Sequence, residues 1–295
     1  MFEKIVGNTK IKQIIEKTIE QNTVSHSYMF IGPQGIGKKM IAEEFAKKIL
    51  CLDNKSENCK CKSCIEFNTS NNPDFSCIYP EGNNIKVEQI RNLQKKIQEK
   101  PIISNKKVYI IDDADTMTKE AQNSLLKTLE EPPDYATIIL IGSNENAFLT
   151  TIKSRCIILN FRPISNKEMK EYLQNNLHIE ENDEMLDVFQ GSIGKAIKLK
   201  DKKNDYEKII KLIENLSKLD ILSIYKLAEP LYKSKDEIFE ILDYINILLL
   251  KKAKEIYYYA KCINTVEKTK NRLKQNSNYD MCIDDMIFNM WEDVN

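Results

Sequence analysis

The sequence predicts a parallel α/β domain followed by a region that is entirely helical. In the first half, short apolar runs alternate with segments whose apolar residues recur at helical spacing, the pattern of strand–helix–strand units. Beyond residue 163 no further convincing strand follows, and helical patterns continue to the end. Only 8 Gly and 8 Pro among 295 residues favour helices and argue against a fibrous or low-complexity protein.

Four buried strands are predicted in the first half. Each is a short, continuous apolar run, which is typical of the strands of a parallel sheet. The runs lie at 28–31, 108–111, 137–141 and 157–161. The accompanying helices are predicted at 11–19, 38–50, 87–97 and 124–130. Two prolines, Pro132 and Pro133, end the last of these helices, because proline cannot continue the helical hydrogen-bond ladder.

After residue 163 the pattern predicts a small helical unit and then a larger one. The helices of the small unit are predicted near 165–177, 181–190 and 194–200. The polar stretch 200–205 reads as a boundary, and long amphipathic helices follow it. We therefore expect three domains without an internal repeat, at 1–163, 164–205 and 206–295.

Charge and composition exclude several classes of protein. The 44 basic residues equal the 44 acidic ones, which argues against coating DNA through a strongly basic surface, although a local basic face remains open. With only 2 His, a nuclease or deaminase that uses a histidine base is poorly supported. The start of the chain lacks the apolar segment of a secretory signal, and the apolar runs are too short to span a bilayer. We therefore expect a cytoplasmic protein.

A phosphate-binding loop is predicted between the first strand and the helix after it. Residues 32–38 match the pattern G-x-x-x-x-G-K, in which backbone N–H groups and the helix dipole attract a phosphate. The positions that carry this chemistry are Gly32, Gly35, Gly37 and Lys38. An ordinary glycine-rich turn is the alternative. Lys39 stands where Ser or Thr holds Mg²⁺ in active enzymes, so we expect ATP binding to be weak or absent and hydrolysis to be inefficient.

Carboxylates follow the second predicted strand. Asp112 is positioned to hold a metal ion, and Asp113 to polarise a water molecule, with a side chain one methylene shorter than the usual Glu. For Asp115 we expect a cap on the following helix. Arg155 precedes the fourth predicted strand, a place from which an arginine finger reaches the nucleotide of a neighbouring subunit. Taken alone, such an arginine is more often part of a surface ion pair.

Half of the eight cysteines crowd into one short insertion near 51–64. Cys51, Cys59, Cys61 and Cys64 would supply four thiolate ligands to a structural, tetrahedral Zn²⁺ ion. Their C-x-C-x₂-C spacing is tighter than the usual C-x₂-C, and scattered free thiols are the alternative. The other four cysteines show no partner pattern and are expected to be core or surface thiols.

Together these segments resemble the AAA+ subunits of the bacterial DNA polymerase III clamp loader. The resemblance covers at least residues 1–200 and includes the phosphate loop, the cysteine insertion and the segments 25–28, 85–91, 123–133 and 154–156. It implies a RecA-like AAA+ domain with a parallel sheet, a small helical lid and an all-α C-terminal collar that mediates oligomerisation. It also implies partners: gamma/tau ATPase subunits, a delta subunit, the sliding clamp and primed DNA.

Two kinds of subunit share these motifs, the gamma/tau motor and the delta-prime stator. The resemblance implies that a motor subunit has Ser or Thr at the position of Lys39, Glu at the position of Asp113 and a sensor Arg at the position of Gly194. This chain has none of these three residues. Each departure removes a group that holds metal, water or the γ-phosphate, whereas Arg155 is kept. The chain therefore resembles the delta-prime type, which does not hydrolyse ATP and donates an arginine finger to its neighbour.

Two other functions compete with this one. An active ATPase motor of the gamma/tau type is the alternative, and Lys39 with Gly194 argues against it. A free-standing, zinc-containing nucleic-acid binder is opposed by the zero net charge and by the lack of interleaved basic and aromatic residues. We expect a subunit of a DNA polymerase holoenzyme without ATPase or polymerase activity of its own.

Overall fold

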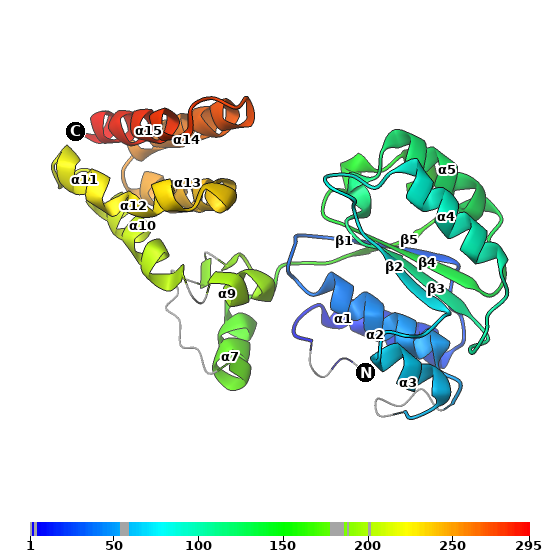
Figure 1. The fold of residues 1–295 in the computed structure, drawn as a ribbon. Coiled ribbons are helices and arrows are strands. Elements are labelled where there is room, and N and C mark those ends of the chain that lie inside the picture. The colour runs from blue at the N-terminus through cyan, green and yellow to red at the C-terminus, as the bar shows by residue number, and fades with distance from the viewer. Residues whose placement is uncertain (1, 3–4, 54–58, 178–185, 188, 200–201) are drawn as a thin grey trace. The chain divides into compact units, whose positions relative to one another are not determined.

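The chain forms two compact units, Met1–Ala196 and Ile197–Asn295 (Figure 1). The structure, a computed structural model, describes residues 2, 5–53, 59–177, 186–187, 189–199 and 202–295. In these residues the first unit combines a sheet with helices, and the second unit is helical throughout. The expected division into three domains, with boundaries near 163 and 205, stays a prediction.

A five-stranded parallel sheet forms the centre of the first unit. In spatial order its strands are β2 (Phe75–Ile78), β3 (Lys107–Ile111), β4 (Ala136–Gly142), β1 (Ser27–Ile31) and β5 (Ile157–Asn160). Every neighbouring pair is parallel; Met29 of β1, for example, lies opposite Leu140 of β4 and Ile158 of β5. The predicted parallel α/β domain is confirmed, and the C-terminal ends of all the strands lie at one edge of the sheet.

Among the strands of the described residues, the edge strand β2 is the one that the sequence pattern did not predict. It has four residues, and each of them is only half-buried. Central strands such as β3 and β4 are buried along their whole length and therefore form continuous apolar runs. An edge strand is covered on fewer sides, so it tolerates Ser76 and Cys77 within it and gives a weaker signal.

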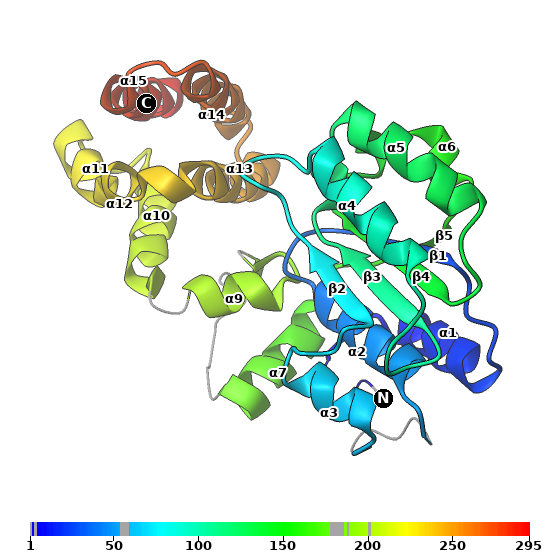
Figure 2. The ribbon, with the colours of Figure 1, turned by 45° about the vertical axis from the view of Figure 1, so that its right-hand side comes forward.

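Helices cover both faces of the sheet (Figures 1 and 2). On one face lie α1 (Thr9–Glu20) and α2 (Lys38–Leu50), whose apolar residues join those of the strands in one buried cluster. On the other face lie α4 (Val87–Gln98) and α5 (Lys119–Glu130), whose apolar residues join those of the strands in a second buried cluster. This three-layer arrangement is the one expected when strands and helices alternate along the chain.

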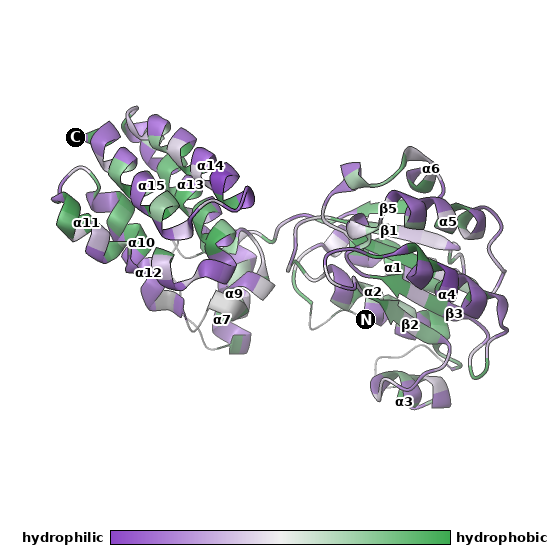
Figure 3. Ribbon diagram, turned by 45° about the horizontal axis from the view of Figure 1, so that its top comes forward, coloured by the Kyte–Doolittle hydropathy of each residue, from purple (hydrophilic) through white to green (hydrophobic). Residues whose placement is uncertain are grey.

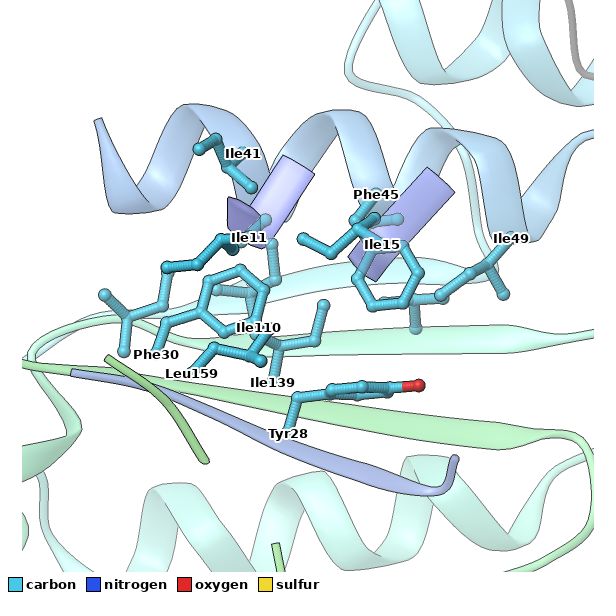
Figure 4. Close-up of a cluster of buried hydrophobic side chains, with 14 of the residues drawn as sticks. Ile11, Ile15, Tyr28, Phe30, Ile41, Phe45, Ile49, Ile110, Ile139 and Leu159 are labelled. Atoms are coloured by element: carbon cyan, nitrogen blue, oxygen red, sulfur yellow. The ribbon is translucent and has the colours of Figure 1, made fainter. Parts of the chain in front are cut away.

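The first cluster fixes β1 against α1 and α2 (Figure 4). Ile11 and Ile15 lie four residues apart on α1 and are both buried, as the helical spacing in the sequence predicted. The Phe45 ring of α2 meets the Tyr28 ring of β1 edge to face, with 5.1 Å between their centroids. Since the phosphate loop connects β1 to α2, this packing holds both ends of the loop.

The second unit is a set of helices with a core of its own. Its helices are α10 (Lys203–Asn215), α11 (Ile221–Leu227), α12 (Glu229–Lys233), α13 (Ile238–Glu255), α14 (Tyr259–Lys274) and α15 (Tyr279–Val294). Apolar residues from several of them are buried together, among them Leu242, Ile245, Val266 and Ile283. Figure 3 shows the hydrophobic colour on the strands of the first unit and on α13 of the second.

The region after the sheet agrees with the predicted helices where the structure describes it. α7 (Asn166–Leu177) and α9 (Ile193–Leu199) correspond to the helices predicted at 165–177 and 194–200. Most of the helix predicted at 181–190 lies outside the described residues. Shorter elements complete the first unit: α3 (Lys62–Asn68), α6 (Thr150–Lys153), η1 (Ala114–Thr116) and η2 (Glu145–Ala147). Among the described helices, none has both the length and the apolar character needed to cross a membrane.

Candidate functional site

The predicted phosphate loop lies between the end of β1 and the first turn of α2. Gly37 precedes the helix with φ 89°, a conformation that glycine adopts without steric strain. Gly32 follows β1 directly, and a Cβ added there would lie 2.6 Å from the carbonyl oxygen of Phe161. The loop therefore has the strand–loop–helix setting that the motif requires, at the edge of the sheet where parallel strands end.

The Lys38 side chain points back into its own loop. Its Nζ donates hydrogen bonds to the carbonyl oxygens of Gly32 at 2.5 Å and Pro33 at 2.7 Å, and the residue is 7% exposed. Burial lowers the pKa of Lys38, and the nearby carboxylates of Asp115, Asp113 and Asp112 oppose this shift. The ammonium group that would meet a phosphate is thus bound to the loop backbone.

Lys39 lies between the phosphate loop and the acidic end of β3. Its Nζ is 3.4 Å from Asp112 Oδ2 and 3.1 Å from the Tyr79 hydroxyl, and it lies 4.4 Å from the centre of the Tyr79 ring. Partial burial alone would lower the pKa of Lys39, but the Tyr79 hydrogen bond and the Asp112 charge outweigh burial and raise it. Lys39 is therefore held in its cationic form against the carboxylate that the sequence assigned to a metal ion.

The two aspartates after β3 differ in their surroundings. The Asp112 carboxylate faces Lys39, as described above. Asp113 adopts φ 48° at the start of η1, and burial followed by the charges of Asp112 and Asp115 raises its pKa. The structure therefore brings Lys38, Lys39 and both aspartates to one edge of the sheet, as the motif predicted.

The expectation that Asp115 caps the following helix is wrong. Its Oδ2 accepts hydrogen bonds from the Ser143 backbone N–H at 3.0 Å, the Ser143 hydroxyl at 2.8 Å and the Asn144 N–H at 3.0 Å. The cap of α5 is instead Thr118, whose hydroxyl accepts from the Ala121 N–H. Asp115 lies within η1, before the Thr118 cap of α5, and its carboxylate holds the segment after β4.

The start of α9, together with Ser192 just before it, lies against the phosphate loop, and we call this the lid–loop contact. The Gly194 N–H donates to the Gly35 carbonyl oxygen at 3.0 Å. Gly35 has φ 73°, and a Cβ added there would lie 2.2 Å from Ser192 Oγ, a buried atom. A Cβ at Gly194 would lie 3.0 Å from the Gly35 Cα. A side chain at position 194 would therefore press against the backbone of the phosphate loop.

Arg155 lies in the turn between α6 and β5, and its guanidinium group is engaged within the chain. One nitrogen is 2.8 Å from Glu130 Oε1 at the end of α5, and the other donates to the Thr151 carbonyl oxygen at 2.8 Å and the Ser154 hydroxyl at 3.2 Å. About a third of the Arg155 side chain and half of the Glu130 side chain are exposed. Since such exposed pairs contribute only about 0–1 kcal/mol, the guanidinium can exchange Glu130 for another anion at little cost.

The four clustered cysteines form a candidate metal centre. The Sγ atoms of Cys51, Cys59, Cys61 and Cys64 all lie within 4.8 Å of one another, with 3.5 Å between Cys51 and Cys59 and 4.0 Å between Cys51 and Cys61. Zn–S bonds of about 2.3 Å in a tetrahedron place the sulfurs about 3.8 Å apart, so the spacing fits. All four are free thiols, and residues 54–58 between them lie outside the described part.

Local structure explains how these thiols come together. Cys51 directly follows α2, and Cys61 directly precedes α3, which carries Cys64. Cys59 and Cys64 are buried, and the Cys61 N–H points toward the Cys59 sulfur at 3.5 Å. The donor set of four sulfurs fits a structural metal ion with no open position for water.

Three residues at the site were not identified from the sequence: Tyr79, Glu130 and Ser192. Each contacts a predicted residue from a distant part of the chain, so no local pattern could reveal it. Tyr79 follows the missed strand β2, and the alternation of Phe75, Cys77 and Tyr79 was the signal that could have identified it.

A family model described as DNA polymerase III, delta subunit, matches residues 7–165, which is more than half of the chain. The match includes the phosphate loop, the cysteine cluster, the aspartates after β3 and Arg155. It ends at the beginning of α7, and the second unit lies outside it.

Curated relatives agree with this family. DNA polymerase III subunit delta' of Bacillus subtilis is 38% identical over 165 residues, which cover 56% of this chain and 50% of that protein. The delta' subunit of Pseudomonas aeruginosa is 34% identical over 137 residues, 45% of this chain and 42% of that protein. The tau/gamma subunit of Haemophilus influenzae is 31% identical over 209 residues, 68% of this chain and 30% of that protein. The chain thus matches half or less of the length of these relatives.

A solved structure supports the fold over nearly the whole chain. It is a DNA polymerase III, gamma subunit-related protein from Thermotoga maritima, which covers 95% of this chain and 99% of its own with a TM-score of 0.53. At 21% identity this similarity concerns the fold alone, an α/β domain followed by helices. With the family match and the delta' relatives, it leads to one conclusion. The chain belongs to the delta-prime family of DNA polymerase III clamp-loader subunits, which is related to gamma and tau.

Proposed function

We propose that this chain is the non-hydrolysing stator subunit of a DNA polymerase III clamp loader. In this role it helps to load the sliding clamp onto primed DNA, together with gamma/tau ATPase subunits and a delta subunit. It carries a structural Zn²⁺ ion, has no ATPase of its own and supplies Arg155 to the ATP site of a neighbour. Family membership supports the clamp-loader setting, and the geometry at the phosphate loop supports the stator role.

The observation that carries the proposal is the position of Lys39. A catalytic Mg²⁺ needs oxygen ligands at about 2.0–2.1 Å, supplied by a Ser or Thr of the loop and a strand-end Asp. Here the first ligand is replaced by an ammonium group, which lies 3.4 Å from the carboxylate of Asp112. The lysine supplies one positive charge to Asp112, fills the space of the metal ion and repels a second cation. Hydrolysis therefore lacks its metal.

Two further features support the absence of turnover. The Lys38 ammonium is bound to carbonyl oxygens of the loop instead of facing outward. The lid–loop contact joins Gly194 to Gly35 directly, through a hydrogen bond between their backbones. In a motor subunit a sensor arginine at position 194 would meet the γ-phosphate, and its absence here fits a subunit with one fixed state.

Arg155 and the cysteine cluster have separate roles in the proposal. Arg155 retains a planar guanidinium at the end of an exposed ion pair, which suits transfer to the γ-phosphate of a neighbour's ATP. The zinc ion, held by Cys51, Cys59, Cys61 and Cys64, would tie the end of α2 to α3. Its role is structural, because the four thiolates fill the coordination sphere.

ATP turnover by the purified chain tests the central claim. We expect none above background, with or without primed DNA, and we expect Lys38→Ala to have no effect on that background. A gamma/tau-type motor, the alternative, would hydrolyse ATP in a reaction that Lys38→Ala abolishes, and that result would refute the stator role. Mixing the chain with gamma/tau and delta subunits then tests whether it joins a complex that loads clamps.

A further inference from the structure

The neutral charge of the whole chain conceals a strong separation of charge in the second unit. Residues 251–275 contain eight Lys or Arg against two Glu, a net charge of +6. Residues 276–295 contain five Asp or Glu and no basic residue. The basic segment covers the end of α13, the turn after it and all of α14. A local positive field of this kind attracts a polyanion even when the chain as a whole is neutral.

One exposed row of residues along α14 carries no carboxylate, and we call it the α14 stripe. Its members follow one another at steps of four and three residues, so they lie on the same side of the helix. They are Tyr257, Lys261, Asn264, Lys268, Asn271 and Gln275, all exposed. The Tyr257 carbonyl oxygen accepts from the Ala260 N–H, so the first helical turn already includes the tyrosine. Lysine and amide side chains are among the groups that donate hydrogen bonds to phosphate oxygens.

Lys261 and Lys268 of the stripe differ from Lys270 and Arg272 of the same helix, which both pair with carboxylates. Lys270 pairs with Asp243 at 2.5 Å and with Glu267 at 2.8 Å, and Arg272 pairs with Asp285. No carboxylate of the described residues forms such a pair with Lys261 or Lys268. Seven residues of helix separate these two lysines by about 10 Å, so a phosphate backbone that follows the helix meets both.

Exposed aromatic rings lie at one end of the stripe. Tyr257 is 80% exposed and Tyr258 61%, whereas the next residue, Tyr259, is 1% exposed and belongs to the core. Two consecutive tyrosines in water, with Ile256 also 42% exposed, leave ring faces that are free to stack. Lys254, exposed at the end of α13, adds a cation beside them.

We propose that the α14 stripe, together with Tyr258 and Lys254, binds single-stranded nucleic acid. Unpaired lysines at one helix face contact the phosphates, and the tyrosine rings at its end stack on bases. A duplex hides its bases from such rings, and a membrane surface would require large apolar residues along the stripe, which it lacks. This inference rests on the proposed clamp-loader role, because the primed DNA of that role includes an unpaired template strand. The residues of the stripe, with Tyr258 and Lys254, are the ones that would contact this strand.

The binding test uses the full-length chain and a fluorescein-labelled oligothymidylate of about 20 nucleotides, longer than the site of a typical single-strand-binding module. Fluorescence anisotropy at low salt gives the affinity. The variant Lys261→Gln with Lys268→Gln should bind about tenfold or more weakly, and the slope of log affinity against log salt should shrink by about 1.4, for two lost phosphate contacts. The variant Tyr257→Ser with Tyr258→Ser should weaken binding and leave the slope unchanged. A duplex of the same length should bind less tightly than the single strand.

The chain offers a matched control on α1, where Lys10 and Lys17 are exposed and also seven residues apart. The change Lys10→Gln with Lys17→Gln removes the same charge at the same spacing and should leave binding intact. The inference is overturned if the oligothymidylate does not bind, or if the control loses as much affinity for it as the α14 variant does. It is also overturned if the α14 variant binds the oligothymidylate normally and loses only its assembly with other subunits. That result would make the stripe a protein interface. Oligothymidylate binding needs no complex. Failed binding with intact clamp loading therefore refutes this inference alone, and intact binding with failed clamp loading refutes the proposed function alone.

Discussion

At Gly35 a single missing side chain allows the lid to lie on the phosphate loop. The residue has φ 73°, and the position of its absent Cβ is 2.2 Å from Ser192 Oγ. A side chain at Gly35 would cost free energy in two ways, through backbone strain and through collision with the lid. Gly82 separates these two costs, because it has nearly the same φ, 71°, and no atom within 4 Å of its Cβ position. Alanine at Gly82 meets only the backbone strain, whereas alanine at Gly35 meets the strain and the lid.

We predict that Gly82→Ala lowers the free energy of unfolding by about 1–2 kcal/mol, the cost of the left-handed conformation. Gly35→Ala should lower it by about 1–3 kcal/mol more, because of the collision with Ser192. Adding Ser192→Ala to Gly35→Ala should recover part of the difference. Urea denaturation of the variants measures these values, and equal losses for the two glycines would show that the lid–loop contact is absent in solution.

Arg155 is the residue whose effect is expected in another subunit. Arg155→Ala should leave this chain folded, since it removes a half-exposed ion pair with Glu130 that is worth about 1 kcal/mol or less. In a reconstituted clamp loader, ATP hydrolysis at the neighbouring subunit's site should become about 10³-fold slower or more. DNA-stimulated ATP turnover of the complex should therefore fall by the contribution of that site. Lysine should not restore it, because it lacks the planar fork of the guanidinium group.

The control for this prediction is Lys153→Ala on α6, which breaks a comparable ion pair with Glu145 of η2. It should change neither turnover nor clamp loading. If Arg155→Ala has as little effect as this control, Arg155 only forms a surface ion pair with Glu130 and is no arginine finger. This is the simpler interpretation of the sequence.

At the scale of elements, prediction from the sequence succeeded where a pattern is local. The phosphate loop is a contiguous motif between an apolar strand and an amphipathic helix, so residues 32–38 were identified with their setting. The cysteine cluster needs only a short segment and was identified as well. The strand β2 was missed, since four half-buried residues at a sheet edge form no apolar run.

The contacts that give the site its character could not be predicted in the same way. Lys39 donates a hydrogen bond to Tyr79, which is forty residues later in the chain. Arg155 forms an ion pair with Glu130, and β4 and α6 lie between these two residues in the sequence. Asp115 was assigned to the nearest helix, whereas its actual partners follow β4, beside it only in space. Such pairs are set by the order of strands in the sheet, and periodicity along one element contains no information about that order.

The cysteine insertion is the element whose stability should depend on metal. We predict that about one Zn²⁺ accompanies each chain purified without chelator, and that Cys64→Ser loses it. The reason is that each thiolate fills one corner of a tetrahedron whose sulfurs already lie within 4.8 Å. Cys77→Ser, a change outside the cluster, should keep the metal. Elemental analysis measures the content, and zinc-free wild-type protein would contradict the assignment.

At the scale of the whole molecule, the chain consists of two units with separate cores. The site residues and the family match belong to Met1–Ala196, whereas Ile197–Asn295 carries none of the predicted site residues. A helical unit that serves only as an appendage would be expected to cover its apolar residues with its own helices. Here several large apolar side chains stay exposed on it, among them Leu222 at 72%, Met281 at 65% and Leu250 at 53%.

The last prediction concerns assembly through this second unit, proposed as the oligomerisation collar. On α15, Met281 and Phe288 are seven residues apart on one side of the helix and are 65% and 47% exposed. Changing both to Gln should leave the thermal midpoint of the isolated chain nearly unchanged, because exposed side chains contribute little to folding. It should weaken assembly with gamma/tau subunits by about tenfold or more, since apolar side chains that lose water at an interface carry much of the binding energy. Ile14→Gln on α1, which removes an apolar side chain of 48% exposure from the other unit, is the control. Analytical ultracentrifugation of the mixtures measures the affinity, and equal assembly of the wild type and the α15 variant would exclude this face of the collar from the interface.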